Sequence, residues 1–97
     1  MSKKFPATID QYLRSYSAYV KYWDEEAGDS DQLLSLREWL EFNSSIMDSS
    51  ETSEMVSIDD EVLALSKTHA AKGSWDAVML KQTAELIRQS RQERIAA

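Results

Sequence analysis

The chain contains no cysteine, one proline and two glycines among its 97 residues. The lack of cysteine excludes disulfide bonds, thiol catalysis and cysteine-bound zinc, and it suits a reducing compartment such as the cytoplasm. The scarcity of proline and glycine favours helices over a turn-rich β fold, because these residues interrupt helices and form tight turns. No apolar run approaches the ~20 residues of a membrane-spanning helix, so we expect no membrane contact.

Basic residues are also in the minority, since 17 acids outweigh 11 bases and give a formal net charge of −6. This balance argues against direct nucleic-acid binding, because neutralising phosphates needs a basic surface. The acids are concentrated between Asp24 and Glu61, where Arg37 is the one base. The length suits a single domain over residues 1–97, with basic tails at residues 1–6 and 91–97.

Apolar residues recur at helical spacing in several segments. The clearest runs from Ile9 to Ala27, where the intervals alternate between four and three. Thr8 with Gln11 predicts a capping box before this helix, and Gly28 predicts its end. A second helix is expected from Asp31 to Met47. Its predicted inner face is Leu33, Leu36, Trp39, Leu40, Asn43, Ile46 and Met47, with Phe42 at the rim.

Residues 48–57 show no periodicity and are rich in serine and acids, so they are predicted to form a mobile loop. A third helix is predicted to begin at Ser57 and to end at Gly73. Ser74 is expected to cap the fourth, whose apolar pattern fades after Ile87. Together these segments predict an all-α fold, a small antiparallel helical bundle of four amphipathic helices. A three-helix core with a loosely docked fourth helix is the alternative.

Residues suited to catalysis or metal binding are sparse. The one histidine, His69, lies on the apolar face of the third predicted helix, where a structural role is expected. A calcium loop that began at Asp29 would need glycine at its sixth position, which is Leu34. We therefore expect no enzymatic activity, no metal and no cofactor.

Acidic residues form a regular row on the second predicted helix. Steps of three and four place Asp31, Leu34, Glu38, Glu41, Ser45 and Asp48 on one outward face, here called the predicted stripe. A solvated helix surface is the simpler interpretation of such a row. The functional interpretation is a docking surface for another protein with a basic surface. In the extreme case, the carboxylates imitate nucleic-acid phosphates.

The corner between the first two helices adds five candidate partner-binding residues: Tyr22, Asp24, Glu25, Glu26 and Asp29. Three of these acids would lie at a helix C-terminus, where the helix dipole disfavours anions, and a local rule broken without obvious gain points weakly to function.

We predict a small acidic protein-binding protein that inhibits or modulates its partner by occluding a nucleic-acid-binding surface, as small phage proteins often do. One alternative is a helix-turn-helix-like DNA-binding regulator that uses the third and fourth helices around Gly73, Ser74 and Trp75. A structural or assembly subunit is the other. A homodimer also stays open, because Leu34, Leu63, Val78 and Ile95 lie outside the main apolar faces.

Overall fold

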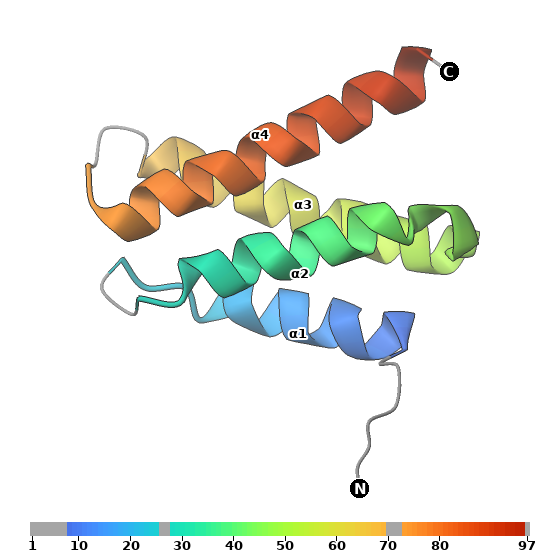
Figure 1. Ribbon diagram of the computed structural model, residues 1–97, viewed down its shortest axis with the longest axis horizontal. Helices are drawn as coiled ribbons and strands as arrows, with labels where there is room; N and C mark the ends of the chain where they lie inside the picture. The colour runs from blue at the N-terminus through green and yellow to red at the C-terminus, as the bar shows by residue number, and fades with distance from the viewer. Residues whose placement is uncertain (1–7, 26–27, 70–72, 97) are drawn as a thin grey trace, which may run out of the picture.

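Four α-helices account for most of residues 8–25, 28–69 and 73–96, the part of the chain that the computed structural model describes (Figure 1). Helix α1 spans Ile9–Lys21, α2 spans Ser30–Phe42, α3 spans Ser49–Thr68 and α4 spans Trp75–Ala96. A short 3₁₀ helix, η1, spans Ser44–Ile46. These described residues include no strand, and the predicted all-α bundle is confirmed.

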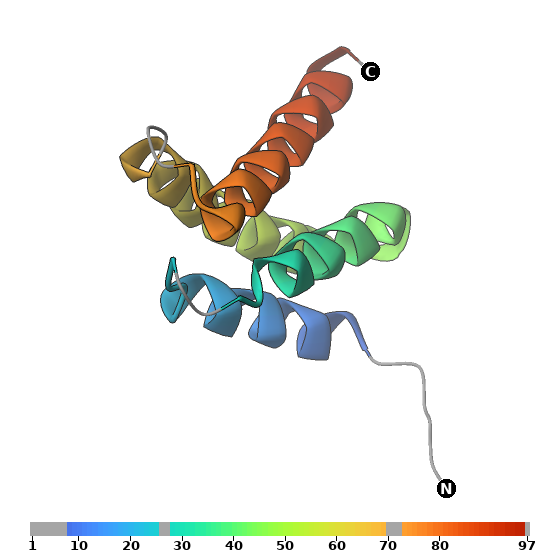
Figure 2. The same cartoon turned by 60° about the vertical axis from the view of Figure 1, so that its left-hand side comes forward.

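Successive helices run in opposite directions, so the bundle alternates up and down (Figure 1). Helix α2 packs against α1 and α4, and α3 packs against the same two helices. The order around the bundle is therefore α1, α2, α4, α3, which places the α1–α2 pair opposite the α3–α4 pair. Helix α4 diverges from α3 towards its C-terminal end (Figure 2).

The core is built from residues at helical spacing on all four helices. Its buried members are Leu13, Tyr16, Val20, Leu33, Leu40, Met55, Ile58, Val62, Leu80 and Ile87. Removing such side chains from water stabilises a fold by roughly 1.5–3 kcal/mol each. Two predicted caps are also present. The Thr8 and Gln11 side chains accept hydrogen bonds from each other's backbone N–H groups, and Ser74 Oγ accepts one from the Ala77 N–H at 3.2 Å.

Helix α1 is shorter than predicted, because it ends at Lys21 and not at Ala27. Ending there keeps Lys21 in the last turn, where the helix dipole favours a cation, and leaves Asp24 and Glu25 beyond the helix. The prediction that Asp24 and Glu25 lie inside the C-terminal end of a helix, where its dipole disfavours anions, is therefore wrong. Gly28 has a φ of 78°, which suits glycine, but it lies in the connection to α2 and does not cap α1.

Helix α2 also ends earlier than predicted. Asn43 is its C-cap, and the Asn43 side chain donates a hydrogen bond to the Trp39 carbonyl at 2.9 Å. The chain then turns through η1, so Ile46 lies outside the core with 69% of its surface exposed. The prediction that Ile46 belongs to the inner face is wrong, because the helical periodicity ends with α2 at Phe42.

The prediction of a mobile loop at residues 48–57 is wrong, because α3 begins at Ser49. Asp48 is its N-cap and forms a capping box with Glu51, in which Glu51 N–H donates to Asp48 Oδ1 at 2.7 Å. The first turns of α3 show little apolar periodicity because most of their side chains face solvent. Met55 is the first α3 residue that reaches the core.

Candidate protein-docking surface

A cluster of charged and polar side chains lies inside the bundle. It includes Arg37, the one base between Asp24 and Glu61. Arg37, on α2, is fully buried and binds Asp59 of α3 through two hydrogen bonds, from Nε to Oδ1 at 2.8 Å and from Nη2 to Oδ2 at 2.9 Å. The Tyr16 hydroxyl, on α1, donates to Asp59 Oδ1 at 2.5 Å. On the other side, Arg37 Nη1 donates to Glu41 Oε1 at 3.0 Å, and the Ser90 hydroxyl of α4 donates to the same oxygen at 2.7 Å.

We call Tyr16, Arg37, Glu41, Asp59 and Ser90 the central ion cluster. It joins all four helices and crosses the diagonal between α2 and α3, where helix packing alone gives little contact. A buried charge is tolerated only with a partner of opposite charge and saturated hydrogen bonds, and this cluster supplies both. The cluster therefore connects side chains of all four helices in the interior of the bundle.

The pKa values within the cluster agree with this arrangement. Burial, followed by the charge and the hydrogen bond of Asp59, raises the pKa of Tyr16 well above its ordinary 10.0. Burial alone would lower the pKa of Arg37, but the hydrogen bonds and charge of Asp59 outweigh burial and raise it. Burial would likewise raise the pKa of Glu41, but the hydrogen bonds from Ser90 and Arg37 and the charges of Arg37 and Arg94 lower it below 4.5.

The predicted stripe is therefore not one continuous surface. Glu41 is half-buried and belongs to the central ion cluster, because it lies one turn after Arg37 on the side of α2 that faces Ser90 of α4. Asp48 caps α3, and Ser45 lies in η1, so neither is on α2. Of the predicted stripe, Asp31 and Glu38 remain exposed on α2, with half-buried Leu34 between them.

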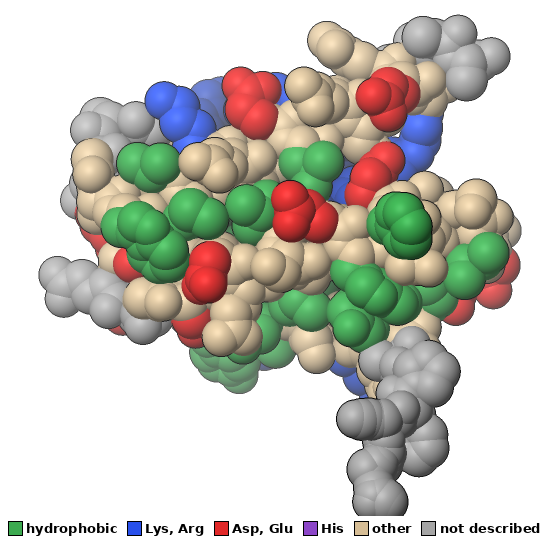
Figure 3. Space-filling view, viewed as in Figure 1, with side chains coloured by type: hydrophobic (Ala, Val, Ile, Leu, Met, Phe, Trp, Pro, Cys, Tyr) green, Lys and Arg blue, Asp and Glu red, His purple; other side chains and the backbone are tan. Residues whose placement is uncertain are grey.

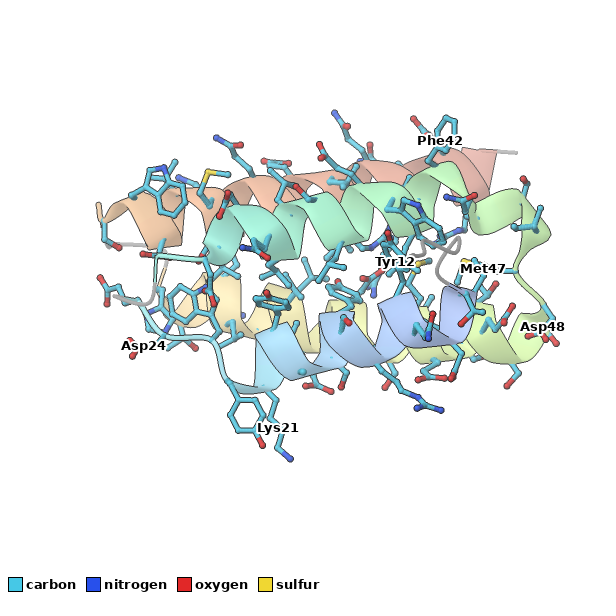
Figure 4. The ribbon with its side chains drawn as sticks, turned by 60° about the horizontal axis from the view of Figure 1, so that its bottom comes forward. Tyr12, Lys21, Asp24, Phe42, Met47 and Asp48 are labelled. Atoms are coloured by element: carbon cyan, nitrogen blue, oxygen red, sulfur yellow. The ribbon has the colours of Figure 1, made fainter. Side chains whose placement is uncertain are left out.

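Phe42 completes this exposed part of α2. It lies one turn beyond Glu38, and 88% of its surface is exposed, the largest value among the exposed large hydrophobic residues of the described part. Figure 4 shows its ring pointing away from the body of the bundle. We call Asp31, Leu34, Glu38 and Phe42 the outer α2 surface. Figure 3 shows apolar side chains gathered along α2, with carboxylates between them.

A groove between α1 and α2 borders the outer α2 surface. Its volume is about 310 Å³, and it is lined by Tyr12, Gln32, Ser35, Leu36 and Trp39. The Tyr12 and Trp39 rings are stacked with centroids 3.6 Å apart and planes inclined by 16°. The two stacked rings give the α1–α2 groove an aromatic wall, and Phe42 lies about one turn beyond Trp39 on α2.

A second hollow, of about 220 Å³, lies at the other end of α1 and is lined by Ala18, Tyr19, Tyr22 and Asp29. We call it the tyrosine pocket. The Tyr19 hydroxyl donates to Gln32 Oε1 at 2.9 Å, and Gln32 also lines the α1–α2 groove, so the two hollows are neighbours. Tyr22 is 74% exposed, and Lys21 Nζ lies 5.5 Å from the centre of its ring.

The structure separates the other candidate residues of the α1–α2 corner. Asp29 is the N-cap position of α2, although its side chain makes no capping hydrogen bond. Asp24 is exposed and Glu25 is half-buried, and both take part in interactions within the molecule. Glu26 lies outside the described residues. Asp24 and Asp48 are at opposite ends of the bundle (Figure 4), so one compact partner surface cannot include both.

His69 lies just beyond the end of α3, where it contacts the connection between α1 and α2. It is the C-cap residue of α3, and its ring lies 4.7 Å from the Trp23 ring at an angle of 56°. Trp23 Nε1 donates to Ser30 Oγ at 2.9 Å, and that hydroxyl donates to Asp76 Oδ1 at 2.6 Å. These contacts tie the first turns of α2 and α4 together at one end of the bundle.

Among the described residues, no group of three or more histidine, cysteine, aspartate or glutamate side chains has a metal-binding arrangement. The helices of this part also include none with the length and hydropathy needed to cross a bilayer. No family model, curated protein or solved structure matches the chain.

Proposed function

We propose that this chain is a protein-binding module that docks a basic segment of a partner protein along α2 and so occludes that segment. The observation that carries the proposal is Phe42, which is 88% exposed and lies one turn from the carboxylate of Glu38. Aromatic residues dominate the energetics of protein interfaces when they are buried on binding. The docking surface consists of the outer α2 surface and the α1–α2 groove.

The chemistry of this surface defines the partner. Asp31 and Glu38 attract cations and raise the rate of encounter with a basic surface. The stacked wall of Tyr12 and Trp39 offers an apolar partner side chain a place out of water. The partner segment should therefore carry lysine or arginine together with at least one large apolar side chain.

The tyrosine pocket would add a place for a cationic side chain. Tyr19 and Tyr22 offer aromatic faces, and Asp29 offers a carboxylate within the same hollow. A lysine or arginine over a tyrosine ring gains roughly 0.5–1 kcal/mol at exposed sites. Lys21 already lies over one face of Tyr22, so the partner cation would use the pocket side of the rings.

The interruption of the predicted stripe argues against imitation of nucleic acid as the mechanism. An extended imitation of nucleic-acid phosphates needs a long row of exposed acids, whereas Glu41 is withdrawn into the central ion cluster. We therefore propose occlusion by a mixed acidic and aromatic surface. The DNA-reading alternative loses support at α4, because a recognition helix uses its first residues on base edges. Here Asp76 and Ala77 are buried in the bundle.

The proposal is tested by binding of a fluorescent synthetic peptide that is rich in lysine and arginine and also contains leucine and tryptophan. Neutralising the surface with Asp31→Asn/Glu38→Gln should lower the affinity by about tenfold at low salt, with a smaller loss at high salt. Phe42→Ala should lower it at every salt concentration, because it removes apolar contact.

The matched control is Glu54→Gln/Glu61→Gln, which removes two exposed acids at the same seven-residue spacing from α3. It changes the net charge by the same amount as Asp31→Asn/Glu38→Gln. Because α3 lies outside the proposed docking surface, this control should keep most of the affinity. Equal losses in both double variants would show that the peptide responds to net charge alone and would refute the docking surface.

A further inference from the structure

A groove on the α3–α4 side of the bundle is lined by basic residues, in contrast to the acidic outer α2 surface. Its volume is about 440 Å³, and it is lined by Leu63, Ser66, Lys67, Lys81 and Arg88. We call it the basic groove. Lys67 comes from α3, whereas Lys81 and Arg88 come from α4, so cations stand on both walls. Leu63 is half-buried and Ser66 is nearly buried, which gives the groove an apolar and uncharged floor.

The cations of the basic groove are largely uncommitted to strong ion pairs. Lys67 and Lys81 are exposed, and the contact of Arg88 with Glu85 is long, at 3.9 Å, between two side chains that are each more than half exposed. A contact of that kind contributes little to stability. In a chain of net charge −6, three such cations around one hollow form a local site for an acidic ligand.

We propose that the basic groove receives the outer α2 surface of a second copy of this chain. The spacing of the charges supports this pairing. Asp31 and Glu38 are separated by seven residues on α2, and Lys81 and Arg88 are separated by seven residues on α4. Seven residues correspond to about 10 Å along a helix, so two helices laid side by side bring both charge pairs into register.

Each of the two surfaces also contains an apolar residue. Leu34 lies between Asp31 and Glu38, and Leu63 lies on the floor of the basic groove, so a docked α2 would place apolar side chains inside a rim of ion pairs. This is the usual anatomy of a protein interface, with an apolar centre and a charged edge.

The position of the two surfaces determines the form of the assembly. Helix α2 contacts α1 and α4, whereas α3 is its diagonal neighbour, so the outer α2 surface and the basic groove lie on different sides of one molecule. The outer α2 surface of one chain cannot fill the basic groove of the same chain, so the contact joins different surfaces of two copies. Such head-to-tail contacts leave one surface of each kind free in a dimer, so they continue into a ring where the rotation closes and into an open row of copies where it does not.

The inference rests on the outer α2 surface of the proposed function and adds self-association as a second use of it. A copy bound through α2 would shield Phe42 and Glu38 from a basic partner. Self-association and partner binding would therefore compete, and the basic partner would disperse the assembly.

Sedimentation velocity of the full chain over a range of protein and salt concentrations tests the inference. The parent should associate beyond a dimer at low salt and disperse as salt rises. Lys81→Gln/Arg88→Gln and Asp31→Asn/Glu38→Gln should each associate about tenfold more weakly, because each lacks one of the two surfaces. An equimolar mixture of these two variants should form dimers and nothing larger, since each contributes one intact surface.

The matched control is Arg14→Gln/Lys21→Gln, which removes two exposed cations at the same seven-residue spacing from α1. This variant should associate like the parent. A parent that stays monomeric at the highest concentration in solution would overturn the inference, as would association that survives Lys81→Gln/Arg88→Gln. Binding of short duplex DNA that depends on Lys81 and Arg88, without self-association, would assign the groove to nucleic acid and overturn it too.

The two proposals fail separately. Lys81→Gln/Arg88→Gln leaves the outer α2 surface intact, so it should bind the basic peptide as the parent does. If the peptide binds through α2 and the parent remains monomeric, only the self-association is refuted. If the parent associates through both surfaces but does not bind the peptide, the proposed partner chemistry is refuted instead.

Discussion

Glu38 and Glu41 lie one turn apart on α2, and their surroundings are opposite. Glu38 is exposed on the outer α2 surface, whereas Glu41 accepts hydrogen bonds from Arg37 and Ser90 in the central ion cluster. Both residues belong to the same acidic row in the sequence. Neighbouring acids of one row therefore differ in their surroundings, since Glu41 joins two helices through hydrogen bonds and Glu38 faces solvent.

The largest effect is expected where the central ion cluster is most buried. Asp59→Ala would leave the Arg37 guanidinium without its bidentate partner in a site with no exposure. Breaking a buried ion pair in this way costs about 3–5 kcal/mol, so the variant should unfold at much lower urea concentration or fail to fold. Arg37→Met/Asp59→Leu removes both charges and should recover part of the loss.

Arg14→Ala is the control for this experiment, because it breaks the exposed ion pair between Arg14 and Asp10. Its cost should stay below about 1 kcal/mol. If Asp59→Ala is no more destabilising than this control, the central ion cluster does not hold the bundle together.

A second large effect should separate the observed α3 from the loop that the sequence suggested. Ser53 is exposed and is the fifth residue of α3, so proline there would remove a helix hydrogen bond and clash with the preceding turn. Ser53→Pro should cost about 3 kcal/mol in urea unfolding, whereas Ser53→Ala should change little. Equal stability of Ser53→Pro and Ser53→Ala would contradict the observed start of α3 and support the loop predicted from the sequence.

A smaller effect concerns the pH dependence of Glu41. Its pKa in the folded state is lowered, so the ionised side chain stabilises the fold above the ordinary pKa of 4.5, and this contribution is lost as pH falls through the lower folded value. Glu41→Gln should therefore be less stable than the parent at neutral pH, by about 1–2 kcal/mol, and the difference should shrink in acid. A constant difference from neutral pH to acid would contradict the assigned charge interactions.

The helical class and several boundaries could be predicted because local signals determine them. The capping box at Thr8 and the cap at Ser74 are short-range features that survive in the fold. Asp48 and Glu51 have capping-box spacing, but the exposed first turns of α3 have no apolar period, so periodicity does not predict where α3 begins.

The central ion cluster could not be read from hydrophobic periodicity, which discounts charged residues. Arg37 nevertheless continues the buried positions of Leu33 and Leu40, at intervals of four and three. Its partner Asp59 lies on another helix, and only tertiary packing brings the two together. Periodicity likewise places Glu41 on the solvent side, because its partners Arg37 and Ser90 are polar and carry no hydrophobic signal.

One matched pair of variants tests the separation of the two roles most directly. Glu38→Gln and Glu41→Gln remove one charge each from neighbouring turns of α2, and both unfolding free energy and affinity for the basic peptide can be measured in the same low-salt buffer. We predict that Glu38→Gln keeps the parent's stability within about 0.5 kcal/mol and loses affinity, whereas Glu41→Gln loses stability and keeps affinity. Loss of affinity in Glu41→Gln with full affinity in Glu38→Gln would contradict the assignment of the outer α2 surface.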